Sequence, residues 1–187
     1  MKRFLLLTGL IIAVILPLSG QHNNYAEDSS TVRIPGSGFV NIIEISGSSF
    51  GLRHTGSPNE EYYLGVTDIL GYQIDKHFLV GAGFGFMAYD SSSLVPLFLE
   101  IRYTTCFKRI NPYIFYDSGF LVDFKNVADG SQIFINPGVG LSWSFSQRIE
   151  GIFGAGWMMQ MQPNHRTSFI NLKLGLILRK NSISVRV

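Results

Sequence analysis

Apolar side chains recur at every second position through long stretches of this chain. In the stretch 95–107, nearly every odd-numbered position is apolar or aromatic, whereas both charged residues, Glu100 and Arg102, occupy even-numbered positions. The stretches 133–145 and 170–178 alternate in the same way. Successive side chains of a strand point to opposite faces, so each stretch predicts a strand with one continuous apolar face. A helical spacing of three and four residues is sustained nowhere.

Clusters of turn-forming residues separate these alternating stretches. The separators are HTGSPNEE (54–61), IDK (74–76), DSSS (90–93), KRIN (108–111), KNVADGS (125–131), SQR (146–148) and QPNHR (162–166). Seven separators imply eight strands, each of roughly ten residues or more, which is enough to cross the apolar layer of a membrane when tilted.

The second face of each strand is rich in Gly, Ser and Asn, with a few charges of both signs, which suits a narrow barrel interior. Charged residues make up only 15% of the chain, whereas a soluble domain usually carries about 25%. The sequence therefore predicts an all-β fold, an eight-stranded antiparallel transmembrane β-barrel with up-and-down meander order. The alternative is a soluble periplasmic barrel that binds an apolar ligand. In that case Leu97, Leu99, Leu172 and Leu174 would point inward.

The N-terminus has the three-part pattern of a secretory signal peptide. A basic start (MKR) is followed by an apolar run at 4–16 and by small residues before a cleavage point expected at Gln21. That run is short for an uncleaved membrane anchor, the alternative, which needs about 20 apolar residues. We expect a signal peptide at 1–20, a flexible periplasmic leader at 21–37 and an outer-membrane β-barrel at 38–187.

The separators also predict an orientation. With the leader in the periplasm, the connections at 54–61, 90–93, 125–131 and 162–166 face outward, and the other three, shorter on average, face the periplasm. Four aromatic residues are candidates for interfacial girdles: Tyr62, Tyr103, Trp143 and Trp157. The predicted location is the cell outer membrane of a Gram-negative cell envelope. The expected partners are outer-membrane lipids and, during biogenesis, the barrel assembly machinery.

Two stretches fit the alternation poorly. Asp68 shares a face with Leu64, Val66 and Leu70, and a β-bulge there would re-phase the strand. The first strand, 39–52, is ambiguous, because its phase slips near Gly47.

Several stretches resemble the small outer-membrane β-barrel (porin-family) domain of Gram-negative bacteria. They are LGYQIDKHFLVGAGFGF (70–86), VPLFLEIRYTT (95–105), INPYIFYDSGF (110–120), FINPGVGLSW (134–143) and NLKLGL (171–176). The resemblance covers nearly the whole mature chain and implies location and fold, not a reaction. One departure is the end of the chain, which lacks the terminal aromatic residue that such barrels often carry. Recognition by the assembly machinery would then rest on Lys173-x-Gly175 and the aliphatic residues that follow.

Seven charged residues can be placed facing the interior: Glu44, Glu100, Arg102, Asp117, Glu150, Lys173 and Arg179. The first and last strands are neighbours in a closed barrel, so Glu44 is expected to meet Lys173, and Arg102 is expected to meet Asp117 across the fourth and fifth strands. An eight-stranded barrel has an interior just wide enough for side chains. We therefore expect these pairs to plug the lumen. A gated ion path is the alternative, because ionisable groups within a membrane are functional candidates.

The outer loops hold a second polar set: His54, Ser57, Glu60, Glu61 and His165. Histidine and a carboxylate can activate a serine nucleophile, so a lipid-modifying hydrolase or acyltransferase of the outer membrane is the second hypothesis. The chain has no phosphate loop, dinucleotide fingerprint, CxxC, HxxxH or HExxH motif. The interpretation as solvated loop residues is therefore preferred.

The leading hypothesis is a non-enzymatic barrel with a structural, adhesive or very small-pore role, for which we assign no catalytic, cofactor-binding or metal-binding residue and no cofactor. A formal net charge of +2 without a basic stripe argues against a nucleic-acid partner, and no protein partner is indicated. Cys106, the only cysteine, cannot form an intramolecular disulfide and is interpreted as a small packed residue.

Overall fold

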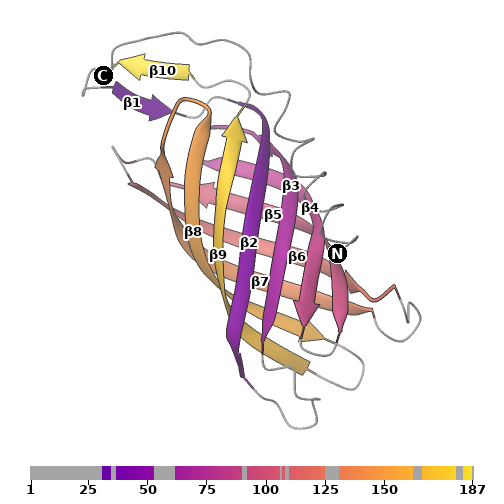
Figure 1. Cartoon of the computed structure of the whole chain (residues 1–187). Coiled ribbons are helices and arrows are strands. Elements are labelled where there is room, and N and C mark those ends of the chain that lie inside the picture. Colours follow the sequence, from indigo (N-terminus) through magenta and orange to yellow (C-terminus); the bar gives the residue numbers. More distant parts are fainter. Residues whose placement is uncertain are drawn as a thin grey trace, which may run out of the picture. The chain divides into compact units, whose positions relative to one another are not determined.

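The structure, a computed structural model, describes residues 31–34, 37–52, 62–89, 92–105, 107, 110–124, 131–161, 166–179 and 183–186. Eight strands close into a barrel in chain order (Figure 1). They are β2 (Gly38–Leu52), β3 (Tyr63–Gln73), β4 (Phe78–Tyr89), β5 (Ser93–Thr104), β6 (Ile110–Val122), β7 (Gln132–Ser144), β8 (Ile149–Met161) and β9 (Arg166–Arg179). Each strand pairs antiparallel with the next, and β2 closes on β9. This confirms the predicted eight-stranded antiparallel meander.

Two short strands lie outside the barrel sheet. β1 (Thr31–Ile34) pairs antiparallel with β10 (Ile183–Arg186) as a two-stranded sheet of their own. β1 falls in the segment expected to be a leader, and the sequence pattern did not indicate this pairing. Within the described ranges, no helix is long and apolar enough to cross a membrane.

The phase slip expected near Gly47 is confirmed. The register of β2 against β9 shifts between Gly47 and Phe50, where Ser48 and Ser49 lie opposite a single residue, Asn171. The Ser48 hydroxyl donates a hydrogen bond to the carbonyl oxygen of Ile170 at 2.7 Å. The extra residue of a β-bulge explains why the alternation of this strand is ambiguous in the sequence.

The β-bulge suggested near Asp68 is not present, so that expectation was wrong. The pairing of β3 with β2 and with β4 is continuous along its whole length. Asp68 therefore keeps its place on the outer face, between Val66 and Leu70. Its carboxylate accepts a hydrogen bond from the side-chain amide of Asn41 on the outer face of β2. Because Asn41 supplies a hydrogen-bond partner on the outer face, Asp68 can stay there without a β-bulge that turns it inward.

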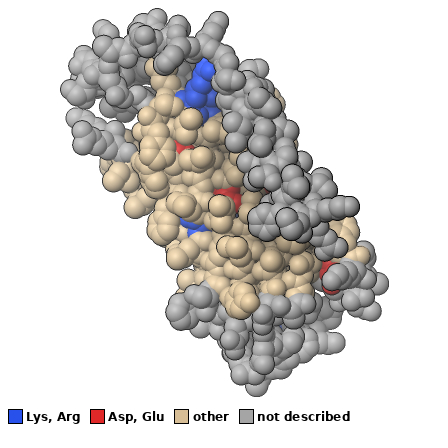
Figure 2. Space-filling model, viewed as in Figure 1, with Lys and Arg blue, Asp and Glu red and all other residues tan. Residues whose placement is uncertain are grey.

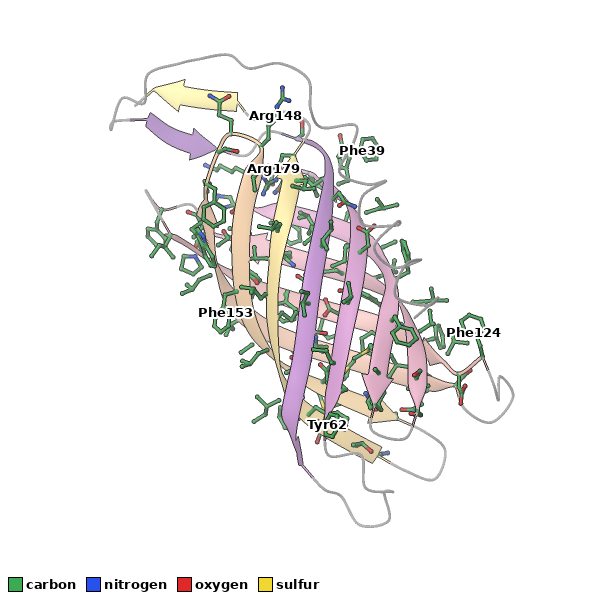
Figure 3. The ribbon with its side chains drawn as sticks, in the orientation of Figure 1. Phe39, Tyr62, Phe124, Arg148, Phe153 and Arg179 are labelled. Atoms are coloured by element: carbon green, nitrogen blue, oxygen red, sulfur yellow. The ribbon has the colours of Figure 1, made fainter. Side chains whose placement is uncertain are left out.

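Burial alternates along the barrel strands as the sequence pattern requires. Leu97, Leu99, Leu172 and Leu174 lie between 47% and 66% exposed, so they point outward. Phe153 of β8 projects away from the barrel wall in the same way (Figure 3). The inward orientation that a soluble barrel with an apolar cavity requires is contradicted, because the apolar faces form the exterior. Apolar and aromatic side chains on the outside suit a hydrocarbon solvent.

Short turns join the strands at one end of the barrel. In the turn after β3, the Asp75 carboxylate accepts hydrogen bonds from the backbone N–H groups of His77 and Phe78, at 2.7 and 2.8 Å. These bonds favour the ionised form and lower the pKa of the Asp75 carboxyl. Between β7 and β8, the Ser146 hydroxyl oxygen accepts in the same way from Arg148 and Ile149. Both turns match predicted periplasmic separators.

Glycines let aromatic rings lie flat against the inner wall. The Phe115 ring covers Gly138, and the Tyr113 ring covers Gly140. A Cβ on either glycine would overlap the ring above it. At these two positions the narrow lumen accommodates a large ring because the residue paired with it on β7 has no side chain.

Replacing Gly138 by Val is expected to destabilise the barrel by about 1–3 kcal/mol, because overpacked positions force side chains and backbone to move. The added Cβ would overlap Phe115 and crowd the carbonyl oxygen of Ala155. The urea midpoint of protein refolded in phospholipid vesicles measures the effect. Ala82→Val, at an exposed outward position, is the control and is expected to leave the midpoint unchanged. Equal midpoints for the two variants would contradict this packing.

Candidate functional site

A network of charged side chains occupies the middle of the barrel interior. It consists of Glu44 from β2, Glu100 and Arg102 from β5, Asp117 from β6 and Lys173 from β9, each at most 5% exposed. Buried charges are tolerated only when they are paired and hydrogen-bonded. The contacts within this network show which of these charges are paired.

Arg102 bridges two carboxylates from different strands. Its Nη2 lies 2.8 Å from Glu44 Oε1 and 2.7 Å from Glu100 Oε1. Its Nε donates a second hydrogen bond to Glu100 Oε1 at 2.8 Å. The guanidinium carbon also lies 4.6 Å from the centre of the Tyr113 ring, a cation–π distance. Arg102 therefore joins β5 to β2 across the lumen.

Lys173 forms the second bridge. Its Nζ lies 3.0 Å from Glu44 Oε2 and donates a hydrogen bond to Asp117 Oδ2 at 2.7 Å. The same Asp117 oxygen accepts a hydrogen bond from the Asn136 side-chain amide at 2.8 Å. The ammonium group lies 4.4 Å from the centre of the Phe115 ring. Lys173 thus connects β9 with β2 and with β6.

The network contains one more acidic than basic side chain, since three carboxylates share two cations. Glu44 is contacted by both cations. Among the side chains that the structure describes, Glu100 has Arg102 as its only cationic partner and Asp117 has only Lys173. Removal of either cation would leave at least one buried carboxylate without a counter-charge.

A second ion pair lies nearer the short-turn end. Arg179 Nη2 lies 2.8 Å from Glu150 Oε2, and Arg179 Nη1 donates to the Gln73 side-chain oxygen at 2.8 Å. The Ser142 hydroxyl donates to the other oxygen of Glu150. Arg179 lies at the short-turn end of β9, beside the turn that carries Arg148 (Figure 3).

Apolar layers lie on both sides of the central network. Towards the short-turn end, the Glu150–Arg179 pair is accompanied by buried apolar side chains, which are Val40, Ile42, Ile69, Leu79, Ile152 and Ile177. Towards the loop end, the rings of Tyr63, Tyr89 and Phe169 pack against one another with centroids 5.5–6.2 Å apart. Buried apolar side chains therefore lie between the charged network and each end of the barrel, together with the Glu150–Arg179 pair at the short-turn end.

The inward placement of all seven predicted charged residues is confirmed, because each is buried. The expected pair Glu44–Lys173 is confirmed. The expected pair Arg102–Asp117 is wrong. In the β5–β6 register Asp117 lies opposite Glu100, whereas Arg102 lies opposite Phe115. Arg102 reaches β2 instead, and Asp117 is taken by Lys173 from across the lumen.

Sequence reasoning missed several members of these clusters. The Glu150–Arg179 pair, Asn136 and the two rings beneath the cations were not singled out as partners. The sequence signal for Asn136 was its place on a face rich in Gly, Ser and Asn.

Three of the four predicted girdle residues, Tyr62, Tyr103 and Trp157, are exposed on the outer wall, as girdle residues must be. The fourth, Trp143, packs against Phe145 with ring centroids 5.9 Å apart.

The predicted loop set of His54, Ser57, Glu60, Glu61 and His165 lies outside the described residues, as does Cys106. Within the described ranges, no group of three or more His, Cys, Asp or Glu side chains is placed to hold a metal ion.

Comparison with known proteins identifies the fold. No protein-family model matches the chain, and no curated protein matches it. Among solved structures, it is similar to Neisserial surface protein A, with a TM-score of 0.55 and 11% identity over 77% of this chain and 99% of that chain. A weaker likeness is to a de novo designed transmembrane β-barrel, with a TM-score of 0.46 and 15% identity over 81% of this chain and 99% of that chain. Another is to the N-terminal β-barrel domain of Pseudomonas aeruginosa OprF, with a TM-score of 0.45 and 15% identity over 76% of this chain and 99% of that chain. The likeness to Neisserial surface protein A shows that the chain has the fold of a small outer-membrane β-barrel.

Replacing Arg102 by Met is expected to cost about 3–5 kcal/mol of stability, because breaking a buried ion pair leaves an uncompensated charge. Glu44 and Glu100 would both lose the guanidinium. Unfolding by urea in phospholipid vesicles measures the change. Arg148→Met, in an exposed turn, removes the same side chain and is expected to change stability by less than about 0.5 kcal/mol. Similar losses for both variants would show that the network does not stabilise the barrel.

Proposed function

We propose that this protein is a non-enzymatic outer-membrane barrel of a Gram-negative cell envelope, with a sealed lumen and a structural or adhesive role. The observation that carries the proposal is the buried network of Arg102, Lys173 and three carboxylates between two apolar layers. A signal peptide at 1–20 would direct the chain to export. Outer-membrane lipids and the barrel assembly machinery would be its partners.

The outer wall supports a membrane location. Large apolar side chains such as Leu99, Val139 and Leu174 are more than half exposed there. Figure 2 shows a barrel wall on which charged side chains are few. A contiguous apolar surface of this kind marks a membrane or protein contact. The charged interior also disfavours a soluble carrier of apolar ligands, whose cavity would be lined by apolar side chains.

The interior supports a barrel that does not conduct. Glu44, Glu100, Arg102 and Asp117 are at most 2% exposed, so they fill the lumen at its middle. An ion that crossed would have to separate these ion pairs and pass both apolar layers. A closed interior leaves the loop end of the barrel as the part that faces other molecules, which is consistent with adhesion or support of the envelope.

The same burial disfavours catalysis within the barrel. A general acid or base must lie within hydrogen-bond reach of its substrate, whereas the interior carboxylates are engaged with Arg102 and Lys173 and hidden from solvent. A hydrolase or acyltransferase would have to use His54 or His165. Assays of acyl-ester cleavage with His54→Ala and His165→Ala address that alternative.

Fractionation followed by planar-bilayer recording tests the proposal. We expect the protein in the outer-membrane fraction, with a gel mobility that changes on heating. The purified folded protein is expected to give no single-channel steps, because its lumen is sealed.

Steps of constant size from the wild-type protein would overturn the sealed lumen and favour a very small pore. Recovery in the soluble periplasmic fraction would overturn the membrane location itself.

A further inference from the structure

The apolar outer wall is interrupted near its middle. Among the described residues of the barrel strands, and away from the strand ends, Asp68 is the only charged side chain on the outer face. It is the central residue of the eleven in β3. Asn41 of β2 is the polar residue beside it. This pair has no part in the interior network, so the proposed function does not explain it.

The exposure of this pair follows from the register. Ile43 lies opposite Asp68 on β2, and Phe84 lies opposite it on β4. Ile43 and Phe84 both occupy outward-facing positions of their strands. The carboxylate of Asp68 is therefore held among lipid-facing side chains.

The two side chains use only part of their hydrogen-bonding capacity on each other. The Asn41 amide nitrogen donates to Asp68 Oδ1, and an amide nitrogen carries two hydrogens. The Asp68 carboxylate likewise has more acceptor sites than this one bond uses. Hydrocarbon supplies neither donors nor acceptors, so this spare capacity is costly against lipid. A second molecule that presents both kinds of group at this depth would satisfy it.

We infer that the outer face of β2 and β3, around Asn41 and Asp68, is the contact between two copies of this chain. The pair is self-complementary, because the second hydrogen of the Asn41 amide is a donor and the Asp68 carboxylate is an acceptor. A two-fold axis along the membrane normal would bring the Asn41 of each copy to the Asp68 of the other. All copies enter the membrane in one orientation, so such an axis matches residues at equal depth. A two-fold contact uses the same patch on both subunits.

The surrounding wall suits such a contact. Ile43, Val66 and Phe84 border the pair on three strands that lie side by side (Figure 1). These apolar side chains would pack against the same side chains of the second copy. Polar pairs within membranes contribute affinity through hydrogen bonds between chains. The inference rests on the membrane location proposed above.

The test cross-links single-cysteine variants of the full chain in outer membranes with a short membrane-permeant thiol reagent. The native Cys106 is replaced by Ser. Val66→Cys, next to Asp68, is expected to give a dimer. Val139→Cys is the matched control: it is 60% exposed and lies four strands away on β7, on the opposite side of the barrel. It is expected to give none.

A second change separates the contact from random collision. Adding Asp68→Leu to Val66→Cys is expected to lower the dimer yield about ten-fold, because hydrogen bonds between chains are lost. Asp68→Asn keeps the hydrogen-bonding groups and is expected to retain the dimer. A heat-dependent gel shift shows that each variant is folded.

Equal cross-linking at Val66→Cys and Val139→Cys, or a yield unaffected by Asp68→Leu, would overturn the inference. A product that contains another protein would overturn the second copy as the occupant. Folded protein in the membrane fraction without a dimer refutes this contact alone, whereas absence from the membrane refutes the proposed function.

Discussion

The barrel exists only because its first strand pairs with its last. A sheet within hydrocarbon must close, because every free N–H and C=O group at an edge would lack a partner. The pairing of β2 with β9 removes both edges at once. It joins residues far apart in the chain: the bond from Ser48 to Ile170 spans 122 residues. Contacts of such sequence separation form slowly.

The interior network lies across this closure. Lys173 of β9 contacts Glu44 of β2 over the seam, while Arg102 approaches Glu44 from β5. A slip of one residue in β2 would turn Glu44 to the outer wall and Ile43 to the lumen. Well-packed apolar residues can replace a buried ion pair without loss of stability. We therefore infer that the charges serve mainly to specify the register of the seam and to fill the lumen.

The local part of this structure was readable in the sequence. Strand number, the facing of Leu97 and Glu100 and the phase slip near Gly47 all follow from alternation with a period of two. The actual ion-pair partners of Arg102 and Asp117 do not follow from this alternation. They depend on the register between strands and on side chains that extend across the lumen. Asp68 was misjudged for a related reason. Its partner, Asn41, lies on the neighbouring strand, and a sequence pattern does not show such a pair.

The central claim is that the apolar faces of the strands contact lipid while the charged faces fill the lumen. Fluorophores attached to Leu99→Cys, Val139→Cys and Leu174→Cys, in a Cys106→Ser background and refolded in vesicles, test it directly. These positions lie on three separate strands of the outer wall. Quenching by lipid-attached groups, with protection from a water-soluble quencher, is the predicted result at all three. Quenching from the aqueous phase alone would contradict the account.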